Sequence, residues 1–313
     1  MAPCFVTRRL PGPALERLAA QHDVDVWPGS SPPPPEALRE RTHAAEGLLS
    51  LLTDAVDAEL IAASPRLKVI SNMAVGCDNV DVEAARARGI AIGYTPDVLT
   101  ETTADLAFAL ILAAARRLLE AEAAVRDGQW TTWDPGYLLG RDVHGATLGI
   151  VGHGRIGRAV ARRAAGFGMN VLHTSRAAGT PLEELLERSD FVSLHCPLTP
   201  ETHHLIDDAA LRRMRPTAFL VNTARGPIVD QAALLLALTD GTIAGAALDV
   251  TDPEPLPPDD PLLAAPNLVV LPHVGSATHA TRERMADLAV DNLLAGLAGR
   301  PLPQAFGGTS ARG

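Results

Sequence analysis

Three polar residues with complementary chemistry stand in the C-terminal half of the sequence, each directly after a short apolar segment. Arg225 lies in Asn222-Thr223-Ala224-Arg225-Gly226, Glu254 in Asp252-Pro253-Glu254-Pro255, and His273 follows Leu271-Pro272. An arginine offers a planar fork that matches a carboxylate, a histidine can carry a proton at neutral pH, and a nearby glutamate can orient that imidazole and favour its charged form. Together these residue types suit the binding and protonation of a small 2-keto acid.

Each of the three also has a purely structural interpretation when it is taken alone. Arg225 could form an ion pair, Glu254 could be a solvated loop charge, and His273 could be a hydrogen-bonded residue at a strand end. Their shared position favours the chemical interpretation, because ligands of open parallel sheets lie beyond the carboxyl ends of the strands.

A glycine-rich segment predicts a nucleotide-binding turn. Residues 148–157 read Leu-Gly-Ile-Val-Gly-His-Gly-Arg-Ile-Gly, so an apolar strand leads into G-x-G-x-x-G and then into an amphipathic helix, Arg155–Phe167. Gly152 can take backbone angles closed to other residues, Gly154 lets a pyrophosphate approach, and Gly157 lets the helix pack close to the strand. Because glycine-rich turns are common, it is the strand and helix around the motif that favour dinucleotide binding.

The end of the next predicted strand, Asn170–Thr174, bears on the choice between NAD and NADP. An NAD site expects an acidic residue roughly 20 positions after the glycines, to bind the ribose hydroxyl. Here Ser175 and Arg176 follow the strand, and no carboxylate occurs before Glu183. We therefore predict a preference for NADP, with NAD still possible; the alternative is that Arg176 lies on the surface and both cofactors are accepted.

The composition indicates a globular enzyme of two domains. The chain has 313 residues, of which 47% are hydrophobic and 20% charged. A net charge of −10 argues against nucleic acid or an anionic membrane as partner. The three cysteines (Cys4, Cys77 and Cys196) form no C-x-x-C, so we expect neither disulfides nor a metal site, as in the cytoplasm. The longest apolar stretch, Ala104–Ala115, is shorter than the ~20 residues of a membrane span and is expected to be a buried helix.

Apolar segments alternate with helix-like segments along the chain, which predicts parallel sheets with right-handed crossovers. A long helix is expected from the capping residues Thr100–Thr103 to about Asp127, with a domain boundary near residue 97, and a last helix over Arg282–Leu297. The predicted strands are Cys4–Thr7, Asp23–Val26, Gly47–Leu52, Leu67–Asn72 and Ile90–Gly93, then Leu148–Val151, Asn170–Thr174, Phe191–His195, Ala218–Asn222, Ala244–Asp249 and Leu268–Leu271.

Over essentially its whole length the sequence resembles the D-isomer-specific 2-hydroxyacid dehydrogenase family. The resemblance is carried by Val151–Gly157, His195-Cys196-Pro197-Leu198-Thr199, Asn222–Gly226, Leu248-Asp249-Val250 and Leu271–Ser276. Three further segments resemble the glyoxylate and hydroxypyruvate reductase branch of the family: Val75-Gly76-Cys77-Asp78-Asn79, Gly93–Thr100 and Leu248–Leu256.

The resemblance implies a role for each matching residue. Arg225 would grip the substrate carboxylate and carbonyl, His273 would protonate the carbonyl oxygen while the nicotinamide delivers hydride, and Glu254 would pair with His273. Backbone amides of Val75 and Gly76 would complete the carboxylate site, with Leu51 beside them. His195 is expected to shape the cofactor floor. The expected cofactor contacts are Gly152, Gly154, Arg155, Ile156, Gly157, Ser175, Arg176, Cys196, Pro197, Thr202, Thr223, Ala224, Asp249 (to the carboxamide) and Gly275.

The resemblance also implies an α/β fold with two doubly wound parallel-sheet domains. Residues 98–284 would form the dinucleotide-binding Rossmann domain, and residues 1–97 with 285–313 a flavodoxin-like, discontinuous substrate domain. A homodimer would form around the long helix after Thr103, with an aromatic near Trp130–Trp133 reaching the pocket of the partner. Tyr137 stands where a tryptophan is expected, which leaves the preferred size of the substrate side chain open.

The leading hypothesis is NADPH-dependent reduction of glyoxylate and hydroxypyruvate to glycolate and D-glycerate. One alternative is another member of the family, such as a phosphoglycerate or phosphite dehydrogenase. Such a substrate would call for extra basic residues in the pocket loops, whereas Leu48–Leu52 is apolar. The other alternative is a non-catalytic NAD(P)-sensing protein, against which the intact set of Arg225, Glu254 and His273 argues.

Overall fold

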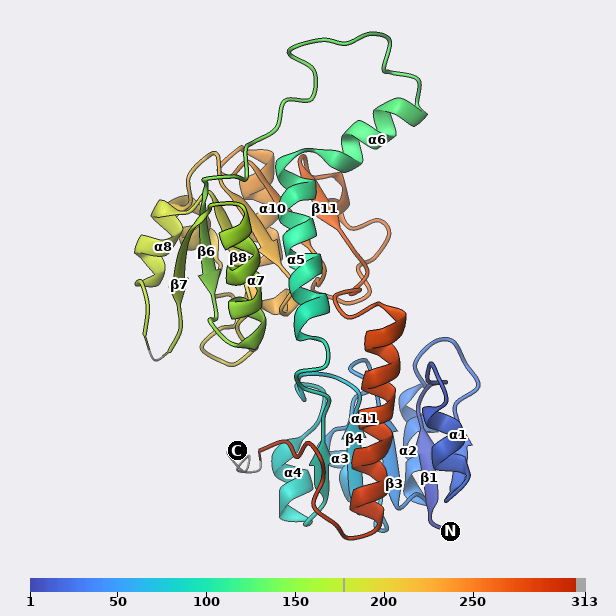
Figure 1. Ribbon diagram of the computed structural model, residues 1–313. Coiled ribbons are helices and arrows are strands. Elements are labelled where there is room, and N and C mark those ends of the chain that lie inside the picture. Colours follow the sequence, from blue (N-terminus) through green and yellow to red (C-terminus); the bar gives the residue numbers. More distant parts are fainter. Residues whose placement is uncertain (177, 308–313) are drawn as a thin grey trace. The chain divides into compact units, whose positions relative to one another are not determined.

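The computed structural model of the chain describes residues 1–176 and 178–307. The chain divides into two compact units: unit 1 comprises Met1–Leu99 and Ser276–Gly313, and unit 2 comprises Thr100–Gly275 (Figure 1). The last part of the segment 285–313, which the sequence assigns to the first of these domains, lies from residue 308 onward outside the described residues.

The sheet of unit 1 is parallel. Its strands, within the described residues, are β1 (Pro3–Val6), β2 (Asp23–Val26), β3 (Gly47–Ser50), β4 (Val69–Asn72) and β5 (Ala91–Gly93). They lie in the order β2-β1-β3-β4-β5, which is the doubly wound order of flavodoxin-like domains. The segments of β3 and β4 are buried throughout, as expected of parallel strands covered on both faces.

The helices of unit 1 include one from the C-terminal part of the chain. They are α1 (Ala14–Ala19), α2 (Pro35–His43), α3 (Ala58–Ala62), α4 (Val82–Ala87) and α11 (His279–Leu297). Helix α11 packs on α1, β3 and β4, and the Ser71 hydroxyl donates to the carbonyl of Ala289 at 2.7 Å. The amide of Asn292 donates to the carbonyl of Tyr94 at 3.0 Å. The last helix is therefore part of the same compact unit as the first 99 residues.

The sheet of unit 2 is also parallel. In the described residues its strands are β6 (Thr147–Val151), β7 (Asn170–Thr174), β8 (Phe191–Leu194), β9 (Phe219–Asn222), β10 (Gly245–Leu248) and β11 (Leu268–Val270). The order is β11-β10-β9-β8-β6-β7, so the winding reverses at β6. Ligands of open α/β sheets bind at such a reversal, beyond the carboxyl ends of the strands. The predicted fold class, two doubly wound parallel-sheet domains, is confirmed.

Helices of unit 2 pack around this sheet. They are α5 (Thr100–Ala115), α6 (Leu118–Arg126), α7 (Arg155–Gly166), α8 (Leu182–Arg188), α9 (Asp208–Arg213) and α10 (Gln231–Thr239), with 3₁₀ turns η1 (Gly226–Ile228) and η2 (Pro261–Ala264). Helix α5 packs on α7, β9 and β10, and its residues Ala104, Ala107 and Ile111 are fully buried. The buried helix predicted over Ala104–Ala115 is confirmed.

The uninterrupted helix predicted to about Asp127 is wrong. Helix α5 ends at Ala115, and α6 begins at Leu118 after Arg117, whose φ of +51° is left-handed. In a continuous helix the carbonyl of Ala115 would accept from the residue four positions on. It instead accepts the N–H of Arg141 at 2.8 Å, so the chain returning from α6 supplies the hydrogen bond that a continuous helix would make.

No helix of the described residues is both long and apolar enough to cross a membrane.

Candidate active site

The turn between β6 and α7 explains its three glycines separately. Gly152 has a φ of +97°, and a Cβ atom there would collide with the backbone of His195 and Cys196. A Cβ atom at Gly157 would collide with the carbonyl oxygen of Gly152. At Gly154, however, an added Cβ would meet no described atom within 4 Å. The first and third glycines thus serve the fold itself, while the open space at Gly154 is available to a ligand.

Helix α7 presents an unneutralised N-terminus at this turn. Its N-cap residue, Gly154, has no side chain to cap it, and no acidic residue lies in the first turn. The backbone N–H groups of a first turn, which here includes Ile156 and Gly157, have no partner within the helix, and the helix dipole adds positive potential. This end of the sheet therefore fits the pyrophosphate of a dinucleotide.

Ser175 and Arg176 follow β7 directly. The Ser175 hydroxyl donates to the carbonyl of Ala178 at 2.8 Å and accepts from the N–H of Ala178 at 3.3 Å, so it closes a turn that contains the exposed Arg176. The pKa of Glu201 is lowered, first by a hydrogen bond from Thr199 and to a smaller extent by the charge of Arg176. Arg176 thus has only a minor electrostatic effect on Glu201.

Two imidazoles stack beside the glycine turn. The rings of His153, in the turn, and His173, in β7, have centroids 3.9 Å apart and planes inclined by 26°. Burial lowers the pKa of His153, and the charges of His173 and Arg158 lower it further. The pair therefore favours the neutral form of His153. The glycine motif itself does not require a histidine at this position.

His195 and Cys196, the first two residues after β8, are uncharged near neutral pH. The Nε2 atom of His195 lies 2.8 Å from the Ser193 hydroxyl, and its Nδ1 atom lies 3.5 Å from the Thr223 hydroxyl. Burial lowers the pKa of His195 to about 4 and raises that of Cys196 to about 11. His195 is therefore unprotonated at neutral pH and is not suited to donate a proton there.

The same loop is closed by Thr202. Its hydroxyl accepts from the N–H of Thr199 at 2.7 Å and donates to the carbonyl of Pro197 at 2.7 Å. These two bonds fix the backbone after Cys196. The structure thus shows that Thr202 stabilises the turn that carries Cys196 and Pro197.

Asn222, the last residue of β9, organises the turn that presents Arg225. Its Oδ1 atom accepts from the N–H of Ala224 at 3.0 Å, and its Nδ2 atom donates to the carbonyl of Arg225 at 2.8 Å. Arg225 itself donates from Nη1 to the carbonyl of Ala224 at 2.7 Å. Sequence reasoning gave Asn222 no role, although an amide at a strand end before a tight turn is a signal for this kind of backbone clamp.

The turn at Arg225 packs directly on the segment that leads to Glu254. A Cβ atom on Gly226 would collide with the backbone of Thr251, so only glycine permits this approach. The positive charge of Arg225 also helps to lower the pKa of Glu254. The structure therefore brings the Arg225 turn and the Glu254 loop to the same edge of the sheet.

Asp249, which follows β10, holds the backbone just after His273. Its Oδ1 atom accepts from the N–H of Val274 and its Oδ2 atom from that of Gly275, both at 2.8 Å. Burial raises the pKa of Asp249, although these N–H groups and the charge of His273 oppose the effect. The sequence predicted only a cofactor contact for Asp249. The structure shows that it also binds the backbone of the loop after His273.

Glu254 and His273 form a hydrogen-bonded pair. The Nδ1 atom of His273 lies 2.9 Å from Oε2 of Glu254, and the two side chains are 26% and 30% exposed. The other carboxylate oxygen, Oε1, accepts from the N–H of Thr251 at 3.1 Å. Burial opposes ionisation of Glu254, but His273, Thr251 and Arg225 outweigh it, so the pKa of Glu254 lies below its ordinary value.

The backbone of His273 is itself unusual. Its φ of +53° is left-handed, a conformation that costs a non-glycine residue of order 1–3 kcal/mol and that clusters at functional sites. The N–H of His273 donates to the carbonyl of Asp249 at 2.9 Å. The surrounding bonds therefore hold the imidazole in a position that the isolated chain would disfavour.

The remaining expected substrate residues lie in unit 1, on loops after β3 and β4. Leu51 follows β3, and its N–H donates to the Oδ2 atom of Asp54 at 2.7 Å. Val75 and Gly76 follow β4; within residues 1–176 and 178–307, neither donates its backbone N–H to another group of the chain. These two N–H groups are therefore available to an anion.

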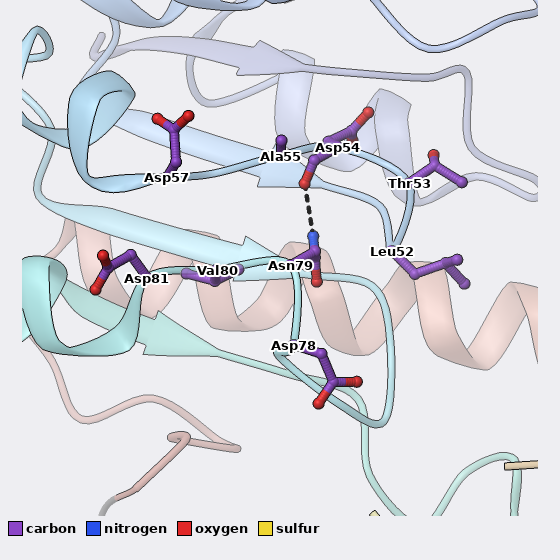
Figure 2. A pocket seen from close by; sticks show the side chains of 9 residues that line it. All are labelled: Leu52, Thr53, Asp54, Ala55, Asp57, Asp78, Asn79, Val80 and Asp81. Carbon is purple, nitrogen blue, oxygen red and sulfur yellow. Dashed lines mark hydrogen bonds between the residues drawn. The ribbon is translucent and has the colours of Figure 1, made fainter. Parts of the chain in front are cut away.

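A surface pocket of about 430 Å³ also lies in unit 1, between the segments 52–57 and 78–81 (Figure 2). Asp57, Asp78 and Asp81 line it, and their charges would repel an anionic substrate. Asp57 caps α3 and Asp81 caps α4 by accepting backbone N–H groups. The two aspartates thus have structural functions, and the pocket is unsuited to a keto acid.

Comparison with known proteins identifies the class. Residues 108–275 match the model of the D-isomer specific 2-hydroxyacid dehydrogenase family, NAD binding domain. A glyoxylate reductase of Korarchaeum cryptofilum is 53% identical over 303 residues, covering 93% of this chain and 91% of the relative. A protein of Thermus thermophilus of known structure is 52% identical, with a TM-score of 0.92 over 97% of this chain and 99% of that one.

A third comparison adds a ligand-bound structure. The NADPH-dependent glyoxylate/hydroxypyruvate reductase of Sinorhizobium meliloti, solved with NADP and malonate, is 34% identical, with a TM-score of 0.84 over 98% of this chain and 97% of that one.

The chain therefore belongs to the D-isomer specific 2-hydroxyacid dehydrogenase family. It is an NAD(P)-dependent dehydrogenase that acts on a small keto or hydroxy acid.

Proposed function

We propose that the protein reduces glyoxylate and hydroxypyruvate with NADPH, giving glycolate and D-glycerate. The observation that carries the chemical part is the pair of Glu254 and His273 at 2.9 Å, beside the turn of Arg225. The relative in Korarchaeum cryptofilum is a glyoxylate reductase and that in Sinorhizobium meliloti a glyoxylate/hydroxypyruvate reductase, which supports these substrates.

In this proposal each of the three residues has one task. Arg225 binds the substrate carboxylate and carbonyl through its planar fork, which fixes the direction of the keto group. Because Glu254 occupies Nδ1 of His273, Nε2 is the ring atom that donates the proton to the carbonyl oxygen. Glu254 fixes the orientation of the imidazole and places a negative charge beside it.

The cofactor would be held by the residues around the β6 turn. The space at Gly154 and the N-terminus of α7 suit its pyrophosphate, and the uncharged residues His195 and Cys196 lie next to the same turn. When bound, the reduced nicotinamide supplies the hydride. The expected contacts with Thr202, Thr223, Ala224, Asp249 and Gly275 belong to this proposal.

The preference for NADP rests on Ser175 and Arg176. No acidic residue stands at the end of β7 to repel a 2′-phosphate, and the turn that Ser175 closes contains Arg176. The reductase of Sinorhizobium meliloti, which is NADPH-dependent, supports this assignment. Because Arg176 is exposed, we expect a preference for NADP and not exclusion of NAD.

Unit 1 would be the substrate-binding domain and unit 2 the cofactor domain. The unused N–H groups of Val75 and Gly76 would bind the substrate carboxylate, and Leu51 would contribute its side chain, because its N–H is occupied by Asp54. We expect the protein to work in the cytoplasm, as its cysteine usage indicates.

A homodimer completes the proposal. The chain from α6 to residue 141 runs out from the sheet of unit 2 (Figure 1), and apolar side chains of this segment are exposed: Leu118, Leu119, Val125, Trp130, Trp133, Tyr137 and Leu139. Exposed apolar surface of this kind marks an interface. Light scattering of the purified protein tests its oligomeric state. Replacement of Trp130 and Trp133 by serine should shift the equilibrium toward the monomer.

The assay that tests the function measures oxidation of NADPH and NADH with glyoxylate, hydroxypyruvate, pyruvate and 2-ketoglutarate. We expect the highest kcat/KM with NADPH and the first two acids. Higher activity with pyruvate or 2-ketoglutarate would overturn the substrate assignment, and absence of turnover with every acid would favour a binding protein.

A further inference from the structure

We propose that Asn79, acting through Asn72, is a positioning residue that fixes both substrate loops of unit 1 in one arrangement. The inference rests on the proposed function, in which Leu51, Val75 and Gly76 meet the carboxylate substrate. It assigns a role to two amides that had none: Asn79 belongs to the segment 75–79 that resembles the reductase branch, and Asn72 ends a predicted strand, but neither was given a task.

The side chain of Asn79 joins the loop after β4 to the loop after β3. Its Nδ2 atom donates to the carbonyl of Leu51 at 2.9 Å and to that of Asp54 at 2.8 Å; the second of these bonds is visible in Figure 2. Its Oδ1 atom accepts from the Nδ2 atom of Asn72 at 3.0 Å. Both donor hydrogens and the acceptor of this amide are therefore in use.

Asn72 extends the connection to Gly76. The side chain is fully buried, and its Nδ2 atom donates to the carbonyl of Gly76 at 2.9 Å as well as to Asn79. Its Oδ1 atom accepts from the Ser50 hydroxyl at 3.1 Å. A buried amide thus anchors the backbone beside the two unused N–H groups and ties it to the end of β3.

Leu51 is held at both of its backbone polar groups. Its carbonyl accepts from Asn79, and its N–H donates to Asp54 at 2.7 Å. Asp54 is itself buried, which raises its pKa, and it also accepts from the Thr7 hydroxyl at the end of β1. Leu51 can therefore offer only its side chain to a substrate, and the amide of Asn79 limits where that side chain lies.

The chemistry of the amide makes the role specific. Asparagine supplies two donors and one acceptor from a short side chain, whereas aspartate of the same shape has no donor when charged. In Asn79→Asp the carbonyls of Leu51 and Asp54 would each face a carboxylate oxygen. In Asn79→Ala all three bonds are lost without a new charge, so the two variants separate the loss of positioning from electrostatic repulsion of the substrate.

The experiment uses the full chain and compares wild type, Asn79→Ala, Asn79→Asp and Asp81→Asn. The last is the matched control: it lies two residues away, and asparagine can still cap α4. For each, kcat and KM are measured with glyoxylate and with glyoxal, which carries an aldehyde in place of the carboxylate, and the Kd of NADPH is measured by fluorescence. Two of these quantities do not depend on the fraction of protein that is folded: KM, and the ratio of kcat/KM for glyoxylate to kcat/KM for glyoxal.

We expect Asn79→Ala and Asn79→Asp to raise the KM for glyoxylate by about tenfold or more, since small misplacements of a binding group have large effects. The preference for glyoxylate over glyoxal should fall in parallel, while the Kd of NADPH and the control stay unchanged. An unchanged KM and preference in Asn79→Ala would overturn the proposal. So would an equal loss with both substrates, because a purely structural defect does not distinguish them.

Hydrogen exchange separates this inference from the proposed function. In Asn79→Ala, amides of residues 51–54 and 73–80 should exchange faster than in the Asp81→Asn control, with the strands of unit 2 unaffected. If wild type fails to turn over any keto acid, the proposed function fails while exchange still tests the link between the loops. If wild type is active and these loops exchange as in the control, the inference fails alone.

Discussion

Glu254 holds the imidazole of His273 across a separation of 19 residues, with Oε2 and Nδ1 2.9 Å apart. The carboxylate cannot turn freely, because Thr251 donates to its other oxygen. On the other side, Asp249 accepts the N–H groups of Val274 and Gly275. The imidazole is thus fixed through both its side chain and its main chain.

Replacing Glu254 by glutamine should shift the pH dependence in opposite senses for the two directions of reaction. The lowered pKa of Glu254 keeps its carboxylate charged at neutral pH, which favours the protonated imidazole needed for reduction. In Glu254→Gln the hydrogen bond can remain but the charge is lost. The pH above which reduction fails should then be lower than in wild type, and oxidation should gain on its acidic side. Identical kcat/KM profiles in wild type and variant would show that Glu254 does not act on the proton donor.

Arg225→Lys should lose about 100-fold or more in kcat/KM although the charge is kept, because an ammonium cannot reproduce a planar two-point grip. The Kd of NADPH should stay within about twofold. Arg212→Lys is the matched control, since Arg212 is exposed and pairs with Asp208 on α9. Near-normal turnover of Arg225→Lys would make Arg225 a structural residue.

Much of the fold follows from local patterns. The apolar segment predicted over Phe191–His195 contains β8, Phe191–Leu194, which is buried throughout, because buried parallel strands read as short apolar runs. The interruption at Arg117 could not be predicted, since its cause is the N–H of Arg141, which arrives from a distant loop. Strand ends were predicted up to two residues too long, as at Gly47–Leu52, because apolar residues continue into the following turn.

The site shows the same division between local and distant information. Position after a strand was enough to single out Glu254 and His273, which the structure places in contact. The tasks of Asn72, Asn79 and Asn222 were not predicted. An amide at a strand end can bind a ligand or clamp the backbone with equal ease, and only the tertiary partners decide between the two.

Arg176→Ala should raise the Kd of NADPH by about 10- to 100-fold, the range expected for loss of a charge-assisted hydrogen bond. NADH should change by less than about twofold, because its ribose carries no phosphate. Fluorescence titration of both cofactors measures this, with Arg188→Ala, an exposed position paired with Glu184, as control. Equal losses for the two cofactors would contradict the assignment of Arg176 to the 2′-phosphate.

His195→Gln should make the protein less sensitive to acid. Burial lowers the pKa of His195 to about 4 from 6.5, so between these values the unfolded chain binds a proton that the folded chain does not. The free energy of unfolding should therefore fall as the pH drops through this window. The upper limit is about 3 kcal/mol, and the actual loss should be smaller because His195 keeps some exposed area. Glutamine does not titrate, and its amide can replace the contact with Ser193. Urea unfolding of the cofactor-free protein at pH 7 and pH 4.5 tests this; an equal loss of stability in both proteins would show that His195 does not contribute.

Alanine at the first and second glycines of the β6 turn should have opposite consequences for folding and binding. In Gly152→Ala the new methyl group meets the backbone of His195 and Cys196 at a φ of +97°, so the free energy of unfolding should fall by several kcal/mol or the protein should fail to accumulate. In Gly154→Ala the methyl group meets no described atom within 4 Å, but Gly154 is the N-cap of α7, where alanine is less favourable than glycine by about 1 kcal/mol. The variant should therefore still fold, with a Tm lowered by only a few degrees. It should nevertheless raise the Kd of both NADPH and NADH, by about tenfold or more, because the methyl group fills the space through which the pyrophosphate approaches the backbone. Thermal melts and cofactor titrations of the two variants measure these effects. A Gly154→Ala protein that is stable and binds both cofactors as wild type does would show that the pyrophosphate does not lie at this turn.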